Sequence, residues 1–211
     1  MKITKFGHSC MLVEENGIRI LIDPGAYTTE QNNLKNVHAV LVTHEHQDHL
    51  NIESLHMVIK RNVGIEVLTN SGVGAILEKE GIGFRIVEDS GRYVLSGVVV
   101  EGFGKEHAVI HRSIPLVHNT GYLVAGRLFY PGDALQKPKI AVEILALPVA
   151  GPWIKLGEAI DYALEVKPKI CFPVHDGMLK SPGAVHRLPN EILTSAGIQF
   201  TALELGKAYE Y

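Results

Sequence analysis

The sequence predicts an α+β fold in which two mainly antiparallel sheets pack face to face, with helices on the outside. Short apolar runs separated by glycine turns predict strands and hairpins. Stretches with helical periodicity lie between those runs, so strands and helices interleave along the 211 residues. No low-complexity linker divides the chain, which predicts a single domain over residues 1–211.

Three hairpins follow one another along the chain. The first joins MLVEE to IRILI through Asn16 and Gly17, a pair suited to a turn in which both positions take positive φ. The second joins RYVL to VVVEGF through Ser96 and Gly97, and the third joins YLVA to RLFY through Gly126. These hairpins are the reason for expecting largely antiparallel pairing.

Four amphipathic stretches predict helices. They cover residues 51–61, 72–81, 156–167 and 190–197. Asn51 is a suitable N-cap for the first, because its side chain can accept a hydrogen bond from a free backbone N–H of the first turn. Because these helices alternate with strands, we expect them to cover the outer faces of the sheets.

The composition argues against some classes of function and partner. Twenty basic residues against 23 acidic ones give a net charge of −3, with no basic stripe that would bind nucleic acid. No apolar run approaches the roughly 20 residues that span a bilayer, and no secretory segment opens the chain, so we expect a soluble, cytoplasmic protein without a membrane partner. Cys10 and Cys171 both adjoin apolar stretches, which favours reduced, buried thiols.

The stretch THEHQDHL carries the strongest functional signal. It follows the apolar run at 39–43, which is typical of a strand buried on both faces. If the chain stays extended, His44 and His46 point the same way, and Asp48 and His49 come from the turn before the next helix. This arrangement predicts two metal positions, which in such sites lie about 3.5–4 Å apart. The alternative is a polar helix cap with solvated histidines.

A metal centre needs more ligands than this one loop supplies, since catalytic zinc usually takes three protein ligands and a water. His107, Asp133 and His175 each follow an apolar run and a glycine or proline that turns the chain. Spacing alone does not choose between His107 and its neighbours His111 and His118. These segments would converge on one edge of the sandwich.

Taken together, the motifs resemble the ordered series of the metallo-β-lactamase superfamily, over residues 1 to about 180. The matching segments are LIDPG (21–25), THEHQDH (43–49), the isolated His107, PGD (131–133) and PVHDG (173–177). The resemblance implies a four-layer αβ/βα sandwich. The GHS at 7–9 and the GPW at 151–153 are most similar to small bacterial metal-dependent hydrolases related to the ascorbate-phosphate lactonases.

The resemblance also implies a role for each residue. Asp133 would bridge two ions, Asp23 would support the ligands without touching metal, and Asp48 would also act in catalysis by moving a proton. The ions would be divalent transition metals, with zinc expected first and Mn, Fe or Ni compatible with the same ligands. One ion would take His44, His46 and His107, and the other would take Asp48, His49 and His175.

Two further residues allow two interpretations each. His8 is either an imidazole facing the substrate or a turn residue, and Trp153 either lines the pocket or packs against its surroundings. We expect His111 to be a pocket residue and Asp176 to be a turn residue before a glycine. Ordinary surface or core positions are expected for His38, His56 and His186.

The predicted function is that of a metal-dependent hydrolase. A metal-bridging hydroxide would attack an ester, lactone or phosphodiester-type bond of a small substrate, and the positive charge of the site favours an anionic one. Di-iron oxygen or nitric oxide reductases of the superfamily generally have Glu where this chain has His46. The remaining alternatives are a nuclease, disfavoured by the charge, and a non-catalytic metal-binding or regulatory protein.

Overall fold

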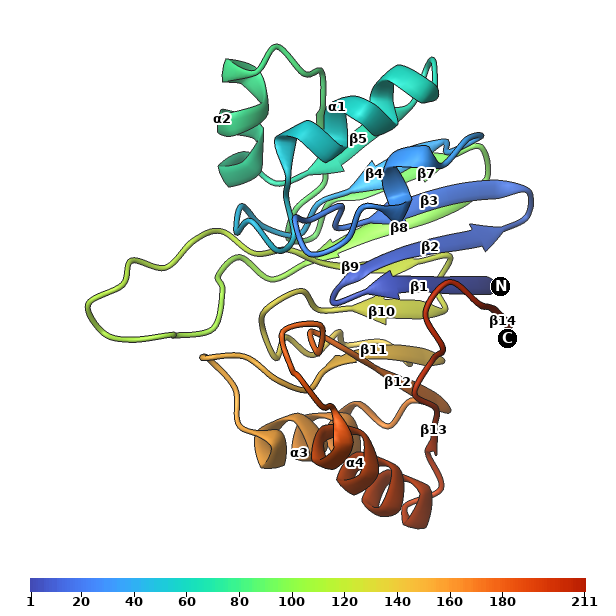
Figure 1. The fold of residues 1–211 in the computed structure, drawn as a ribbon, viewed down its shortest axis with the longest axis vertical. Coiled ribbons are helices and arrows are strands. Elements are labelled where there is room, and N and C mark those ends of the chain that lie inside the picture. Colours follow the sequence, from blue (N-terminus) through green and yellow to red (C-terminus); the bar gives the residue numbers. More distant parts are fainter.

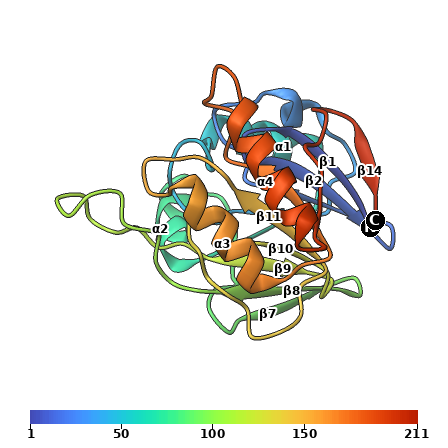
Figure 2. The same cartoon turned by 90° about the horizontal axis from the view of Figure 1, so that it is seen from below.

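Two β-sheets face each other across the centre of the molecule, and helices cover the outer face of each (Figure 1). The computed structural model describes residues 1–211. Helices α1 and α2 lie over the first sheet, whereas α3 and α4 lie side by side over the second (Figure 2). The predicted four-layer sandwich is confirmed.

The first sheet has seven strands in the order β14-β1-β2-β3-β4-β5-β6. Its helices are the short 3-10 helix η1 (Glu30–Asn33), α1 (Ile52–Arg61) and α2 (Ser71–Lys79). Its strands are β1 (Lys2–Gly7), β2 (Cys10–Glu15), β3 (Ile18–Ile22), β4 (Ala39–Leu41), β5 (Glu66–Thr69), β6 (Arg85–Ile86) and, from the end of the chain, β14 (Ala208–Glu210).

The second sheet also has seven strands, in the order β13-β12-β11-β10-β9-β8-β7. Its helices are α3 (Leu156–Val166) and α4 (Gly183–Ser195). Its strands are β7 (Arg92–Leu95), β8 (Val98–Phe103), β9 (Gly121–Val124), β10 (Leu128–Tyr130), β11 (Ile144–Pro148), β12 (Ile170–Val174) and β13 (Gln199–Phe200).

Both sheets are mixed, which corrects the expectation of mainly antiparallel pairing. The strands from β14 to β3 and from β7 to β10 pair antiparallel, as the hairpins predicted. The strands from β3 to β6 and from β10 to β13 pair parallel. Parallel neighbours need a crossover connection, and helices α1 to α4 supply most of these crossovers.

The three predicted turns are confirmed by their backbone angles. Asn16 and Gly17 have φ of 49° and 80°, and Ser96 and Gly97 have 45° and 91°. Gly126 has φ of 67° in the third turn. Residues at these positions must adopt the left-handed region, which glycine and asparagine do with the least strain.

Three helices agree with the predicted ranges to within a few residues, as helix ends usually do. Asn51 caps α1, where its side chain accepts a 2.8 Å hydrogen bond from the backbone N–H of Ser54. The fourth helix, α4, begins at Gly183, well before the predicted residue 190. Pro189 lies inside it and is disfavoured in helix interiors, so the sequence pattern concealed its first half.

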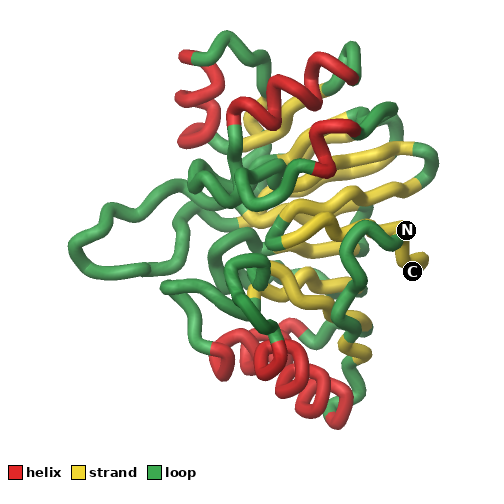
Figure 3. The backbone as a smooth tube through the Cα atoms, viewed as in Figure 1, coloured by secondary structure: helices red, strands yellow, loops and turns green.

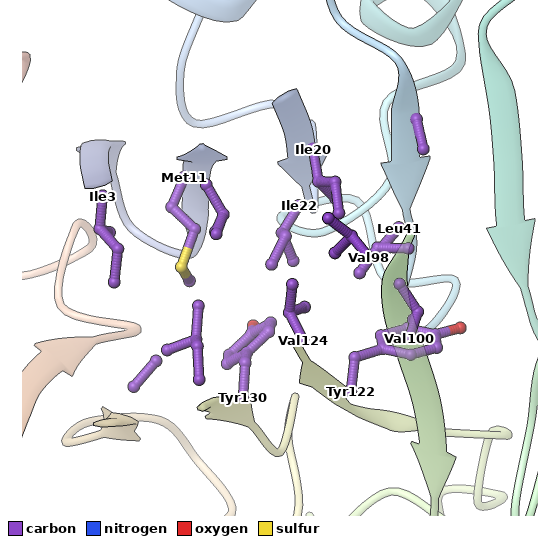
Figure 4. Packing of buried hydrophobic residues seen from close by; sticks show 14 of the residues in the cluster. Ile3, Met11, Ile20, Ile22, Leu41, Val98, Val100, Tyr122, Val124 and Tyr130 are labelled. Carbon is purple, nitrogen blue, oxygen red and sulfur yellow. The ribbon is translucent and has the colours of Figure 1, made fainter. Parts of the chain in front are cut away.

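The central core lies between the sheets and contains 22 buried residues. Side chains such as Ile3, Met11 and Ile22 point from the first sheet toward Tyr122 and Tyr130 of the second (Figure 4). Two further apolar clusters fill the space under the helices. Central strands are therefore buried on both faces, which explains why runs such as AVLV and ICF are continuously apolar.

One long segment leaves the sandwich. Residues 104–120 contain no helix or strand and extend beyond the rest of the molecule (Figures 1 and 3). We call this segment the projecting loop. Its base is closed by hydrogen bonds from His107 N to Val117 O (3.0 Å) and from Asn119 N to Lys105 O (3.1 Å). None of the helices has the length and apolar character needed to cross a bilayer.

Candidate metal centre

The predicted ligands lie at one edge of the sandwich, just beyond the C-terminal ends of strands from both sheets. Strand β4 leads into the THEHQDH loop, β8 into the segment with His107, β10 into Asp133, and β12 into His175. These strands run in the same direction within each sheet, so their C-terminal ends share an edge. Open sheets commonly bind ligands at this edge.

The structure brings all seven predicted ligands together. Their ligand atoms form two groups, and within each group they lie within 4.8 Å of one another. Asp133 adjoins both groups, with Oδ2 3.3 Å from His107 Nε2 and 2.9 Å from His175 Nε2. The groups consist of His44, His46, His107 and Asp133, and of Asp48, His49 and His175 together with His8.

Several ligand atoms at this centre are buried and have no hydrogen-bond partner. They are Nε2 of His44, His49, His107 and His175, and Oδ1 of Asp133. Buried polar atoms are bonded in the great majority of cases, so a group of orphaned atoms facing one point calls for an explanation. A divalent cation satisfies imidazole nitrogens and carboxylate oxygens together, and this donor set suits transition metals.

The other ring nitrogens show how the imidazoles are oriented. His49 Nδ1 donates to Asp23 Oδ2 at 2.7 Å, and His107 Nδ1 donates to the Ala108 carbonyl at 2.6 Å. His44 Nδ1 donates to the Thr43 hydroxyl at 3.0 Å. With the hydrogen on Nδ1, each of the three rings turns Nε2 toward the centre, and this nitrogen offers a lone pair to a cation when the imidazole is neutral.

Asp23 is hydrogen-bonded to the THEHQDH loop, and it belongs to neither group of ligand atoms. It follows β3 and is fully buried. Its Oδ1 accepts a 2.8 Å hydrogen bond from Thr43 N, and its Oδ2 accepts 2.7 Å hydrogen bonds from the Thr43 hydroxyl and from His49. One carboxylate is thus bonded to both ends of the THEHQDH loop, at Thr43 and at His49.

The electrostatics of the centre favour added positive charge. Burial lowers the pKa of His175, but the neighbouring carboxylates of Asp133 and Asp48 outweigh it and raise that pKa to about 9. For Asp133, burial raises the pKa, but His49 and the surrounding imidazoles hold it well below its usual range. Both shifts have the same origin, because closely spaced carboxylates in a buried site stabilise cations.

The backbone at the centre is unusual. His8, Asp23 and His175 have φ of 40°, 47° and 62°, in the left-handed region that side chains rarely adopt. Strained residues of this kind often concentrate at functional sites. Gly25 is also required, because a Cβ there would lie 1.9 Å from the carbonyl oxygen of Asp48.

Asp176 is not the simple turn residue that we expected. It is buried, and its Oδ1 accepts a 2.5 Å hydrogen bond from Lys5 Nζ, which also donates to Pro173 O at 2.8 Å. His186 Nε2 of α4 contacts the other carboxylate oxygen at 2.7 Å. This network anchors the segment that carries His175. Lys5 lies on the same face of β1 as the buried Ile3. A lysine at an inward-facing strand position was therefore the sequence feature that could have indicated a buried ion pair.

Only His107 of the three competing histidines reaches the centre. His111 is exposed on the projecting loop, where Nδ1 bonds the Ser113 hydroxyl at 2.7 Å, so the structure does not bring this predicted pocket residue to the site. His118 lies at the base of the loop, 3.1 Å from the Ser71 hydroxyl.

Trp153 packs beside the proposed ligands. Its ring centroid lies 5.7 Å from that of His107 and 5.8 Å from that of His175. The residue is 8% exposed and its indole Nε1 is buried without a hydrogen-bond partner. Trp153 therefore forms part of the wall around the centre.

The centre is open on one side. Asp48 is 15% exposed and His46 is half-buried, whereas the other proposed ligands are buried. The apolar residues Ile114 and Leu116 of the projecting loop line a small pocket together with His46 and His107. His107 also borders an open cleft of about 640 Å³, which contains none of the other proposed ligands. Among the proposed ligands, the partly exposed side chains of His46 and Asp48 are therefore the ones that a small molecule can reach from solvent.

Comparisons with known proteins agree with the fold and the motifs. Residues 2–175 match the β-lactamase superfamily domain. Protein Rv0786c of Mycobacterium tuberculosis is 36% identical over 184 residues, covering 85% of both chains. A UPF0173 protein of Pyrococcus abyssi is 32% identical over 84% of both chains. A UPF0173 metal-dependent hydrolase of Carboxydothermus hydrogenoformans is 28% identical over 83% of this chain and 84% of its own.

Solved structures share the architecture at lower identity. Igni18, a metallo hydrolase from Ignicoccus hospitalis, superposes with a TM-score of 0.76 and 18% identity, over 100% of this chain and 98% of its own. The metallo-β-lactamase fold protein YhfI of Bacillus subtilis superposes with a TM-score of 0.75 and 13% identity, over 99% and 98% of the two chains. The fold, the ordered motifs and the domain match together establish that this chain belongs to the metallo-β-lactamase superfamily.

Proposed function

We propose that this chain is a hydrolase that holds two divalent transition-metal ions and cleaves an ester, lactone or phosphodiester-type bond of a small anionic substrate. The observation that carries the proposal is the set of buried imidazole Nε2 atoms without partners, which face the carboxylate of Asp133. The naming of similar proteins as metal-dependent hydrolases supports the same class.

The ligands divide between two positions. His44, His46 and His107 would hold one ion, and Asp48, His49 and His175 the other, with Asp133 between them. Zinc is the expected metal, and Mn, Fe and Ni suit the same nitrogen and oxygen donors. Ions bound there would supply an ionised water at neutral pH and would polarise the bond under attack.

The side chains define what else the site does. Asp48 lies on the open side, where its carboxylate can take a proton from the attacking water and pass it to the leaving group. The carboxylates of the two proposed ligands Asp48 and Asp133 would offset only part of the charge of two divalent ions, and a net positive charge would remain with one ionised water bound, so the centre would attract anions. Trp153 and the adjoining apolar side chains limit the access of bulk water.

Two observations bear on the alternatives. The partial exposure of His46 and Asp48 gives a substrate access to the centre, which favours catalysis over a purely structural metal site. The net charge of −3 disfavours a nuclease. Cys10 and Cys171 are buried and free, as the sequence predicted, and reduced thiols of this kind fit the proposed cytoplasmic location.

The test combines metal analysis with a substrate screen. Metal-loaded protein is assayed against sugar-phosphate lactones, thioesters, simple esters and cyclic nucleotides, with metal-free protein and Asp133→Ala as controls. We expect one to two ions per chain, and turnover of at least one substrate class that disappears in both controls. Bound metal without turnover of any class would instead support a non-catalytic metal protein, and absence of bound metal after reconstitution would reject the proposal.

A further inference from the structure

His8 occupies the two-residue connection between β1 and β2, next to the second metal position. Its Nε2 falls in the same group as the ligand atoms of Asp48, His49 and His175. The side chain is 1% exposed, and its ring centroid lies 4.2 Å from that of His175. A histidine buried in this place either binds an ion itself or holds a residue that does.

The hydrogen bonds of the ring decide between these roles. The backbone N–H of Gly177 donates to His8 Nδ1 at 3.2 Å, so Nδ1 acts as an acceptor and carries no hydrogen. A neutral imidazole then carries its hydrogen on Nε2, and this nitrogen donates to Asp48 Oδ2 at 3.0 Å. A nitrogen that bears a hydrogen has no lone pair to offer a metal.

The liganding imidazoles show the opposite arrangement. His49 and His107 each donate from Nδ1 to an oxygen, and their Nε2 atoms are buried without partners. His8 has neither ring nitrogen among the orphaned atoms. The hydrogen bonds of the ring nitrogens therefore separate His8 from His49 and His107, although the distances alone do not.

The backbone holds the His8 ring in this orientation. His175 N donates to His8 O at 3.0 Å, which ties the β1–β2 turn to the segment after β12. His8 itself has φ of 40°. A Cβ at Gly177 would lie 2.8 Å from His8 Cβ, so only glycine permits the backbone N–H at 177 to approach the ring.

We propose that His8 is a positioning residue, which donates its Nε2 hydrogen to Asp48 and so directs that carboxylate toward the second metal position, without binding the ion itself. The inference rests on the proposed function. Asp48 Oδ2 lies 3.4 Å from His175 Nε2 and 3.7 Å from His49 Nε2. Because Asp48 is partly exposed, loss of the His8 hydrogen bond would leave its carboxylate free to turn toward solvent.

The first test measures metal binding in variants. His8→Ala should bind the second ion about 10–100-fold more weakly, as expected when a hydrogen bond to a ligand is removed. His8→Gln should restore affinity to within a few-fold of the unmodified protein, because its amide can donate to Asp48 and accept from Gly177 N–H. His49→Ala provides the reference for a lost ligand.

His38→Ala is the matched control. His38 Nδ1 also accepts a backbone N–H, from Arg19 at 3.0 Å, but His38 is exposed and belongs to neither group of ligand atoms. Its substitution should leave metal binding unchanged. Circular dichroism of each variant shows whether it folds, and if His8→Ala does not, the comparison of His8→Gln with His49→Ala still decides the role.

A second measurement uses NMR correlation spectra of the ring nitrogens, with the His8 signals assigned by their loss in His8→Gln. The hydrogen should be on Nε2 in both the metal-free and the zinc-loaded protein. Three results would overturn the inference: a hydrogen on Nδ1, loss of the second ion in His8→Gln as complete as in His49→Ala, or wild-type affinity in His8→Ala. If the unmodified protein binds no metal, the proposed function fails, while the NMR result still tests the His8–Asp48 hydrogen bond.

Discussion

The two halves of the molecule repeat one succession of elements but use equivalent positions differently. Strands β1 to β6 with α1 and α2 correspond in order and pairing to strands β8 to β13 with α3 and α4. A histidine follows the first strand of each half, His8 and His107, and an aspartate follows the third, Asp23 and Asp133. We propose that in the first half both residues support ligands, whereas in the second both bind metal.

This comparison shows that position at a strand end does not decide the role of a side chain. His107 presents a free Nε2 to the centre because its Nδ1 has an acceptor nearby. His8 lies at the equivalent strand end, but its Nδ1 accepts a hydrogen bond from the backbone of another segment. In this pair, the partner of Nδ1 decides whether Nε2 is left with a lone pair facing the centre or carries a hydrogen.

The largest effect should come from Asp133, the aspartate of the second half. Asp133→Ala removes the carboxylate that adjoins both groups of ligand atoms, so we expect a loss of hydrolysis of at least about 10²–10³-fold. His38→Ala, at an exposed position, is the control and should keep full activity. Equal activities of the two variants in a matched assay would exclude the bridging role.

Replacing Lys5 should have the next largest effect, on stability. Lys5→Met would leave the carboxylate of Asp176 buried with His186 as its remaining partner, and we expect the free energy of unfolding to fall by about 3 kcal/mol. Arg187→Ala breaks an exposed ion pair on α4 instead and should change stability by about 0.5 kcal/mol or less. Urea denaturation measures both, and equal changes would contradict an anchoring role of Lys5.

Substitution of Asp23, the aspartate of the first half, should have a smaller effect than that of Asp133. Asp23→Asn keeps the shape of the side chain but loses an acceptor for His49 and Thr43, so we expect metal affinity to fall about 10–100-fold. Metal titration of the two variants side by side provides the measurement. If Asp23→Asn abolished binding as fully as Asp133→Ala, the division between supporting and binding aspartates would be wrong.

The last prediction concerns pH, which should change metal affinity gradually, by about tenfold per pH unit for one displaced proton. In the metal-free fold the pKa of His175 is raised to about 9, above its unfolded value of about 6.5, so its protonation stabilises that fold below pH 6.5 and the stabilisation is lost as pH rises through 9. Metal must displace this proton, and apparent affinity should therefore increase from pH 6.5 to 9. Competition titrations at several pH values test this, and constant affinity would contradict it.

The two halves also differ in how far the sequence predicted them. Four proposed ligands of the first half lie in one short run, and the spacing of His44, His46 and His49 is rare enough to be informative by itself. His107 and His175 stand alone among other histidines and were candidates because each follows an apolar run. The choice of His107 over His111 and His118 rested on the resemblance. Local patterns also predicted the hairpins and the α1 cap, because these depend on neighbouring residues.

Other features were beyond the sequence because they depend on contacts between distant segments. Lys5 and Asp176 are 171 positions apart, and nothing near either residue identifies the other as its partner. The role of His8 depends on Gly177 in the same way. The parallel halves of the sheets were missed because the hairpins dominated the pattern. The prediction of a single domain stays a prediction.

The pairing of the last strand has a consequence for the order of folding. β14 pairs with β1, and Met1 N donates to Tyr211 O at 2.8 Å, so the edge of the first sheet is completed by the final residues of the chain. Until Ala208–Glu210 have been synthesised, this edge of β1 therefore stays unpaired. Because β1 leads directly into His8, a chain shortened by a few residues at its C-terminus should emerge with a poorly formed second metal position and a tendency to aggregate through the uncovered strand.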